Sequence, residues 1–192
     1  LLAFDEVMAN IEIPAIDVDL PIYHGTKEET LQIGVGHLEN TSLPIGGENT
    51  HAVLSAHCGL PSARLFTDLN LLREGNIFRI HVLDETLTYQ VYKIQTVEPE
   101  DSSSLFIQEG EDIVTLITCT PYGKNTHRLL VHGRRIEEKA DAPIEEPKIE
   151  KKKTWEGYTN LAAMGIAIVF VLLLVGSGIS DLVWRKKYEN AD

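Results

Sequence analysis

Seven short segments that favour β-strands dominate the sequence between Asn10 and Ile136. They are rich in Ile, Val, Leu, Thr and Tyr, and Gly, Pro, Asn or Asp stand between them. Short strands at this spacing are typical of an antiparallel sandwich or barrel, and about seven can close a small core. The predicted strands cover residues 10–13, 16–20, 51–56, 77–83, 86–97, 112–118 and 127–136. We expect a mainly β domain with short helices, for which residues 27–33 and 65–72 are the best candidates.

The segments on either side of this region differ from it in composition. Residues 137–156 are charged and contain Pro but few apolar side chains, so they are predicted to form an unfolded tether. Residues 1–9 are interpreted as a truncated lead-in to the first strand. The sequence therefore predicts one folded domain over residues 10–136.

A run of twenty residues without a charge, residues 161–180, lies near the C-terminus. At about 1.5 Å per residue, a helix of this length crosses a hydrocarbon core of roughly 30 Å. Aromatic residues, which favour membrane interfaces, flank the run. We predict a transmembrane helix within residues 157–184 and a short tail over residues 185–192. Basic residues lie on both sides of the span, so the charge distribution does not predict its orientation.

Charge and cysteine content exclude two classes of function. The formal net charge is −12, and a chain this acidic is repelled by a phosphate backbone, so nucleic acid is not an expected partner. The two cysteines, Cys58 and Cys119, form no Cys-x-x-Cys pair, and the histidines show no close metal-ligand spacing. No metal and no cofactor are therefore expected.

Three residues stand where strands meet loops, and each has two interpretations when taken alone. Cys119 ends the strand DIVTLITC, and it can be interpreted as a small core residue or as a nucleophile. His57 follows the apolar strand HAVLSA and precedes a Gly-Leu-Pro segment that ends the strand. It can be interpreted as a structural or as a catalytic histidine. Arg128 lies on the next strand after Cys119, and it can be interpreted as a solvated surface charge or as a residue of the site.

Together, these motifs resemble the sortase family, and within it the class C sortases that polymerise pilins. TLITC resembles the nucleophile signature of the family, HCGLP resembles its His-x-Gly motif, and Arg128 lies nine residues after Cys119. The segments EIPAIDVDLPIYHGT, LPSARLFTDL and TCTPYGKNTHRLLVHGRR are also similar to class C sequences. The resemblance implies a closed, antiparallel-rich sortase-type β-barrel. It further implies that Cys119 is the nucleophile, His57 the acid and base, and Arg128 the electrostatic stabiliser.

The resemblance also implies a substrate and a cellular location. A class C sortase cleaves an LPXTG-like sorting signal between Thr and Gly through a thioester. It then joins the Thr to a Lys amine of another pilin subunit. Such a substrate reaches the enzyme from outside the membrane, so we expect the domain and tether on the extracellular face of the membrane and residues 185–192 in the cytoplasm. Alternatives are a housekeeping sortase that anchors proteins to peptidoglycan, a hydrolytic cysteine peptidase, or a membrane-tethered adhesin without activity.

Two features depart from the class C pattern. These enzymes usually carry an inhibitory lid upstream of the barrel, and no lid is recognised in residues 1–9, which precede the first predicted strand. Cys58, beside the predicted base, is not expected from the family. We interpret it as incidental variation, with an inhibitory disulfide to Cys119 as the alternative hypothesis.

Overall fold

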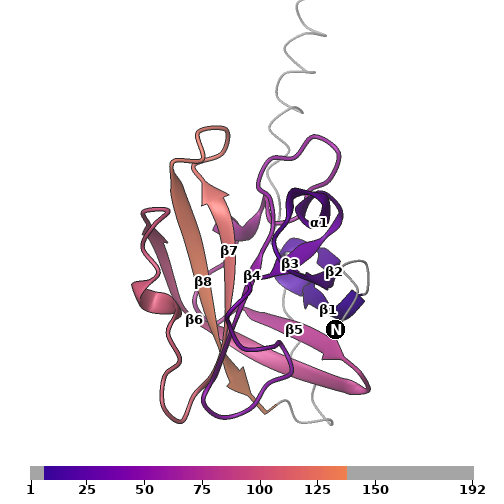
Figure 1. Cartoon of the computed structure of the whole chain (residues 1–192), viewed down its shortest axis with the longest axis vertical. Coiled ribbons are helices and arrows are strands. Elements are labelled where there is room, and N and C mark those ends of the chain that lie inside the picture. Colours follow the sequence, from indigo (N-terminus) through magenta and orange to yellow (C-terminus); the bar gives the residue numbers. More distant parts are fainter. Residues whose placement is uncertain (1–6, 138–192) are drawn as a thin grey trace, which may run out of the picture. The chain divides into compact units, whose positions relative to one another are not determined.

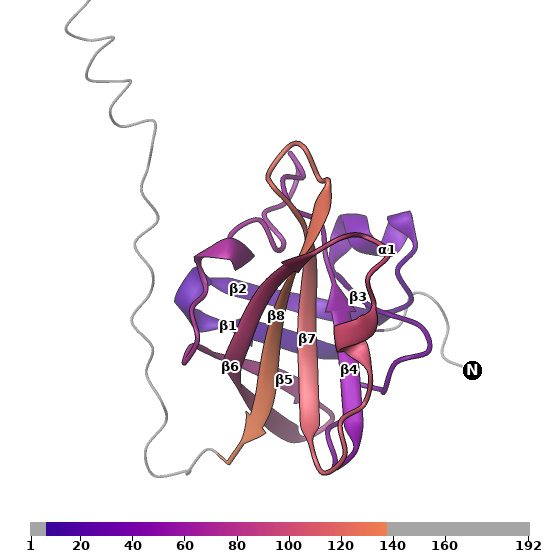
Figure 2. The same ribbon diagram turned by 90° about the vertical axis from the view of Figure 1, so that its left-hand side faces the viewer.

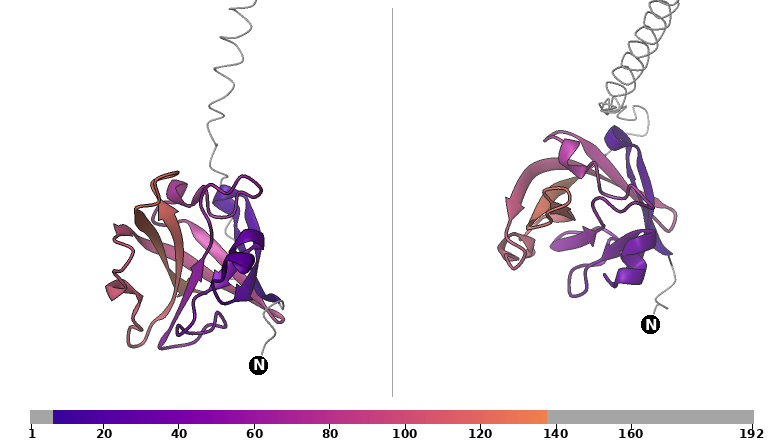
Figure 3. Two further views of the ribbon diagram at one scale, coloured as in Figure 1. Left: turned by 45° about the horizontal axis from the view of Figure 1, so that its top comes forward. Right: turned by 90° about the horizontal axis from the view of Figure 1, so that it is seen from above.

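The predicted strands pair edge to edge until the sheet closes on itself. The computed structural model describes residues 7–137, in which eight strands follow the order β1-β2-β3-β4-β7-β8-β6-β5, with β5 paired back to β1. Figure 3 shows these strands enclosing the interior in two further views. The strands are β1 (Val7–Ile13), β2 (Val18–His24), β3 (Val35–His37), β4 (Thr50–Ser55), β5 (Ile77–Val82), β6 (Glu85–Val97), β7 (Asp112–Thr120) and β8 (His127–Ile136). The predicted closed, antiparallel-rich barrel is confirmed.

Side chains alternate between the interior and the outer face of the barrel. In β1, Ala9, Ile11 and Ile13 are buried in the core, whereas the residues between them are partly exposed. In β7 and β8, the residues that join the core are Val114, Leu116, Leu129 and Val131. Because side chains alternate along a strand, Cys119 and Arg128 belong to the outer face.

The helices are few and short. They are α1 (Glu28–Ile33) and three single turns of 3-10 helix: η1 (Pro14–Ile16), η2 (Leu69–Leu71) and η3 (Ser103–Leu105). The helix predicted over residues 27–33 is confirmed. The longer helix predicted over residues 65–72 is wrong, because Leu65 adopts φ 40°, outside the helical region, and only η2 is helical. The apolar residues of that segment are nevertheless buried in the core.

Three strands differ from the sequence prediction in other ways. β2, predicted over residues 16–20, covers Val18–His24 and so ends four residues later than predicted. β3 was not predicted, because three residues are too few to show an alternating pattern. β1 begins three residues before its predicted start. Helices within residues 7–137 all fall short of the length and hydrophobicity that a membrane span requires. The predicted transmembrane helix (157–184) and the tail (185–192) lie outside the described residues, as does all of the predicted tether after Glu137.

Strand direction brings three chain segments to one end of the barrel. β4 pairs with β7 in parallel, and β7 pairs with β8 antiparallel. The carboxyl ends of β4 and β7 and the start of β8 therefore meet at the same end, at the top in Figure 1, where α1 also lies. The segment between β6 and β7, which contains η3, crosses the outer face of β4 and β7 in Figure 2.

Candidate active site

The strand register brings the three predicted site residues to one level of the barrel. Cys119 of β7 is the direct partner of Arg128 on β8. On the other side of β7, Ser55 of β4 pairs with Ile117. His57 lies two residues after Ser55, as Cys119 lies two residues after Ile117, so the two residues reach the same level. Cys119 is thus flanked by His57 and Arg128 on the outer face.

The loop that carries His57 is fixed by hydrogen bonds before and after it. Thr118 Oγ1 donates to the carbonyl of Ala56 at 2.8 Å, which ties the end of β4 to β7. The backbone N–H of Phe66 donates to the carbonyl of His57 at 3.1 Å. The N–H of Gly59 donates to Thr67 Oγ1 at 3.0 Å. The backbone of His57 is therefore held, while its side chain remains 28% exposed.

Two of the three side chains have other partners in this structure. His57 Nε2 lies 3.3 Å from Glu28 Oε1, at the start of α1. The guanidinium of Arg128 donates to the carbonyls of His127 and Asn125, at 3.1 and 3.3 Å. Cys119 is a free, partly exposed thiol. Within residues 7–137, no hydrogen bond joins the three side chains to one another, and they are neighbours through the strand register.

This set of groups suits acyl transfer. A thiolate can attack a carbonyl carbon, an imidazole can deliver a proton to a leaving amine, and a guanidinium can stabilise the charge on the carbonyl oxygen. Catalytic hydrogen bonds are often loose in unliganded enzymes, so the contacts of His57 and Arg128 do not argue against these roles.

A second polar group lies in the middle of the same outer face. Thr115 Oγ1 lies 2.7 Å from His51 Nε2 on β4 and 2.7 Å from His132 Nδ1 on β8. His51 Nδ1 lies 3.0 Å from the carbonyl of Phe106, in the segment that crosses this face. All three polar side chains are buried. The chain of bonds therefore joins three strands to the segment that covers them.

The carbonyl at one end determines the direction of each hydrogen bond. A carbonyl only accepts, so Nδ1 of His51 carries the proton and Nε2 of the neutral ring accepts from the Thr115 hydroxyl. Thr115 has no second proton to donate, so His132 Nδ1 must donate to its oxygen. His132 Nε2 is then an acceptor, and it is buried without a hydrogen-bond partner in the part of the chain described.

Burial favours the neutral form of the histidines beneath the covering segment and beside it. It lowers the pKa of His132 to about 4, and the neighbouring His51 and Lys93 lower it further. Burial also lowers the pKa of His51, although the bond to Phe106 opposes this effect. The same cause lowers the pKa of His37, whose Nε2 donates to the carbonyl of Ser42 at 2.8 Å.

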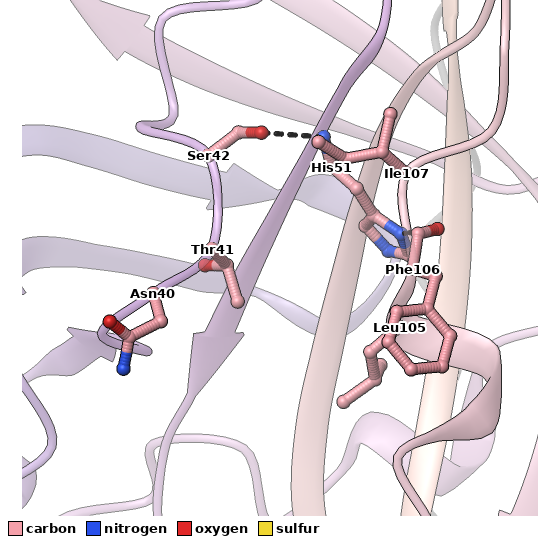
Figure 4. A pocket seen from close by; sticks show the side chains of 7 residues that line it. All are labelled: Asn40, Thr41, Ser42, His51, Leu105, Phe106 and Ile107. Carbon is pink, nitrogen blue, oxygen red and sulfur yellow. Dashed lines mark hydrogen bonds between the residues drawn. The ribbon is translucent and has the colours of Figure 1, made fainter.

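A pocket of about 400 Å³ lies on this face, toward the start of β4 (Figure 4). One wall is formed by Asn40, Thr41 and Ser42, and the opposite wall by residues 105–107. His51 lies between the walls, and its backbone N–H donates to Ser42 Oγ at 2.9 Å. Two of the buried histidines, His37 and His51, thus each hold one wall through a backbone carbonyl.

Sequence reasoning predicted Cys119, His57 and Arg128 as site residues, which the structure brings together, but it did not predict the groups around them. Glu28 gave no signal, because its contact with His57 joins residues 29 apart in the chain. The chain of His51, Thr115 and His132 did leave a signal, because each lies an even number of residues from a predicted site residue on its own strand. Even spacing places them on the same face.

The sequence and fold of this chain are similar to those of known proteins. Residues 11–136 match the family described as the sortase domain. The solved structure of sortase C1 from Streptococcus suis is 56% identical, with 71% of this chain and 76% of that chain covered and a TM-score of 0.70. Sortase C-1 from Actinomyces oris is 55% identical, with 70% and 74% covered and a TM-score of 0.69.

Curated relatives are more distant and longer. Sortase D of Bacillus subtilis is 31% identical over 129 residues, which cover 66% of this chain and 62% of that protein. Sortase A of Streptococcus agalactiae is also 31% identical, over 66% of this chain and 52% of the relative. The chain therefore spans between half and two thirds of the length of these two relatives.

Proposed function

The chain belongs to the sortase family, and on that basis we propose that it is a cysteine transpeptidase that polymerises pilins. The observation that carries this proposal is the register that places Cys119 between His57 and Arg128. Solved sortase C structures from several Gram-positive bacteria, at 52–56% identity, support the class C assignment. Among these similar proteins, sortase C of Streptococcus pneumoniae has a substrate specificity for pilins.

The first half-reaction forms a thioester. The thiolate of Cys119 attacks the Thr carbonyl of an LPXTG-like sorting signal, and negative charge develops on the carbonyl oxygen. Arg128 stabilises that charge, for which its guanidinium turns away from the carbonyls of His127 and Asn125. His57 donates a proton to the Gly nitrogen as the Thr–Gly bond breaks, and the Gly-led fragment leaves as an amine.

The second half-reaction transfers the Thr acyl group. The amine of a Lys side chain on another pilin subunit attacks the thioester carbonyl, and His57 accepts the proton that the amine loses. Cys119 leaves as a thiolate, and an isopeptide bond joins the two subunits. We further propose that residues 157–184 form the predicted transmembrane helix and anchor the enzyme with its barrel on the extracellular face, where both substrates are present.

Thioester trapping tests this proposal. The full chain in detergent is mixed with a peptide containing LPXTG, quenched in acid and weighed by mass spectrometry. We expect an adduct equal to the peptide minus its Gly-led fragment on wild type, and none on Cys119→Ala, whose thermal unfolding should be unchanged. Turnover by Cys119→Ala, or no adduct on the wild type, would refute the proposed role of Cys119.

The choice of acceptor separates the pilin-polymerising function from the alternatives. With the adduct formed, a pilin domain that supplies a Lys amine should resolve it to an isopeptide product. Faster resolution by a peptidoglycan stem peptide would favour a housekeeping sortase. Release of the free acid in the presence of either amine would favour a peptidase.

A further inference from the structure

The chain on both sides of Cys58 is held against the chain on both sides of Cys119. Before Cys58, the N–H of Ala56 donates to the carbonyl of Ile117 at 3.2 Å, and Thr118 binds the carbonyl of Ala56. After Cys58, Gly59 packs against Tyr122 so closely that an added Cβ would lie 2.7 Å from Cε2 of the ring. Cys58 and Cys119 therefore lie on adjacent segments that are in contact both before and after the two cysteines in the sequence.

Adjacent backbone segments of this kind can carry a disulfide. Neighbouring strands of a sheet lie about 5 Å apart, and a disulfide joins residues whose Cα atoms lie within about 7 Å. Both thiols are free and partly exposed, so a soluble reagent can reach them. The contact that Cys58 would give up is weak, because its sulfur lies 4.0 Å from the carbonyl of Thr67.

The ionisation of Cys58 depends on its burial and on the charges near it. Burial raises the pKa of the Cys58 thiol, and negative charge on Cys119 and Asp68 raises it further. Conversion of Cys119 to an uncharged mixed disulfide removes the contribution of Cys119. Cys58 then becomes a thiolate more readily, at the step in which it must attack.

We propose that Cys58 and Cys119 form a reversible thiol–disulfide pair that reacts with low-molecular-weight disulfides. The Cys119 thiolate attacks one sulfur of the small disulfide and releases one small thiolate, leaving a mixed disulfide on Cys119. The Cys58 thiolate then attacks the Cys119 sulfur and releases the second small thiolate. Two protein thiols are oxidised, one small disulfide is reduced to two thiols, and the nucleophile is stored in a form that cannot be acylated.

Disulfide mapping under a defined redox poise tests the pair. The full chain in detergent is equilibrated with mixtures of reduced and oxidised glutathione, alkylated with iodoacetamide, digested and analysed by mass spectrometry. We expect a linked peptide that contains Cys58 and Cys119 and is lighter by two hydrogens. Alkylation of Cys119 should fall by at least about tenfold under oxidising conditions and return with dithiothreitol.

The Cys58→Ser variant is the matched control. It should give no linked peptide and should accumulate a glutathione adduct on Cys119 under the same conditions, while its reduced form is alkylated as fast as the wild type. The proposal is overturned if the wild type gives only glutathione adducts, or if the disulfide joins two chains on a non-reducing gel. The inference concerns the same nucleophile as the proposed function, but the linked peptide is detected without any activity, and thioester trapping in reductant tests that function separately.

Discussion

Two regions of one face of the barrel use histidine in opposite ways. At the end of the face, His57 is partly exposed and its imidazole contacts a carboxylate that is itself 66% exposed. In the middle, His51 and His132 are buried at 1% and 2% exposure and share the hydroxyl of Thr115. The histidines lie on the same face, so the difference in their exposure comes from the segment between β6 and β7, which covers only the middle of that face.

The contrast separates a group that exchanges protons from groups that hold structure. A general acid and base must reach solvent or substrate, and a side chain beyond the covering segment can do so. A neutral histidine under that segment instead satisfies hydrogen bonds that would otherwise be lost. We therefore expect changes in the middle of the face to affect stability and changes at its end to affect acylation.

The largest effect should come from Thr115→Val, which preserves shape but removes the shared hydroxyl. His51 Nε2 and His132 Nδ1 would each lose a buried partner, at about 1–3 kcal/mol each, so we expect about 4 kcal/mol less free energy of unfolding. Urea denaturation measures this loss. Thr115→Ser keeps the hydroxyl and should cost only about 1 kcal/mol for the lost methyl group. If Thr115→Val is as stable as Thr115→Ser, the hydroxyl of Thr115 does not contribute to stability.

The middle of the face should also make stability depend on pH. The folded pKa of His132 is about 4, below the unfolded value, so its contribution is complete above about pH 6.5. As the pH falls from there to about 4, only the unfolded chain binds the proton, and this residue alone should reduce the stability by about 3 kcal/mol. Urea titrations at several pH values measure the slope. His132→Gln should show a shallower slope, and equal slopes would contradict the prediction.

At the end of the face, Arg128→Lys should lower the rate of acylation with little change in stability. A single ammonium does not reproduce the rigid fork of a guanidinium, and the loss of one oxyanion donor typically costs about 10²-fold or more. Stopped-flow or quenched mass measurements of adduct formation give the rate. The control is Arg134→Lys, on the same strand and face but paired with Glu111 at 2.7 Å, which should stay within about twofold. Similar rates for the two variants would make Arg128 a surface charge.

The smallest effect should come from Glu28→Gln. The contact between Glu28 and His57 is exposed, and exposed ion pairs contribute little. We expect the acylation rate to change by less than about threefold, with the difference shrinking in high salt. A tenfold loss that persists in high salt would instead show that Glu28 positions the catalytic imidazole.

The sequence predicts the site better than the surroundings of the site. The motifs around Cys119, His57 and Arg128 are local in the sequence, so they single out these three residues without knowledge of the strand pairing. The hydrogen bond between His51 and Thr115 joins residues 64 apart and needs the register of a parallel pair. No local pattern contains that register. Likewise, the apolar residues Leu65, Phe66, Leu69 and Leu72 show helical spacing, and all four are buried. The N–H of Phe66 nevertheless donates to the carbonyl of His57 rather than within a helix.

The parallel pairing of β4 with β7 also has a consequence for how the chain folds. It joins Thr50 to Asp112, so a loop of about 60 residues must close before any contact between the strands forms. Hairpins such as β5 with β6 and β7 with β8 need far shorter loops and should form first. Cys119 and Arg128 then meet early, while His57 joins them only when the barrel closes. The kinetics of thiol protection at Cys119 and of burial around β4 should therefore differ during refolding.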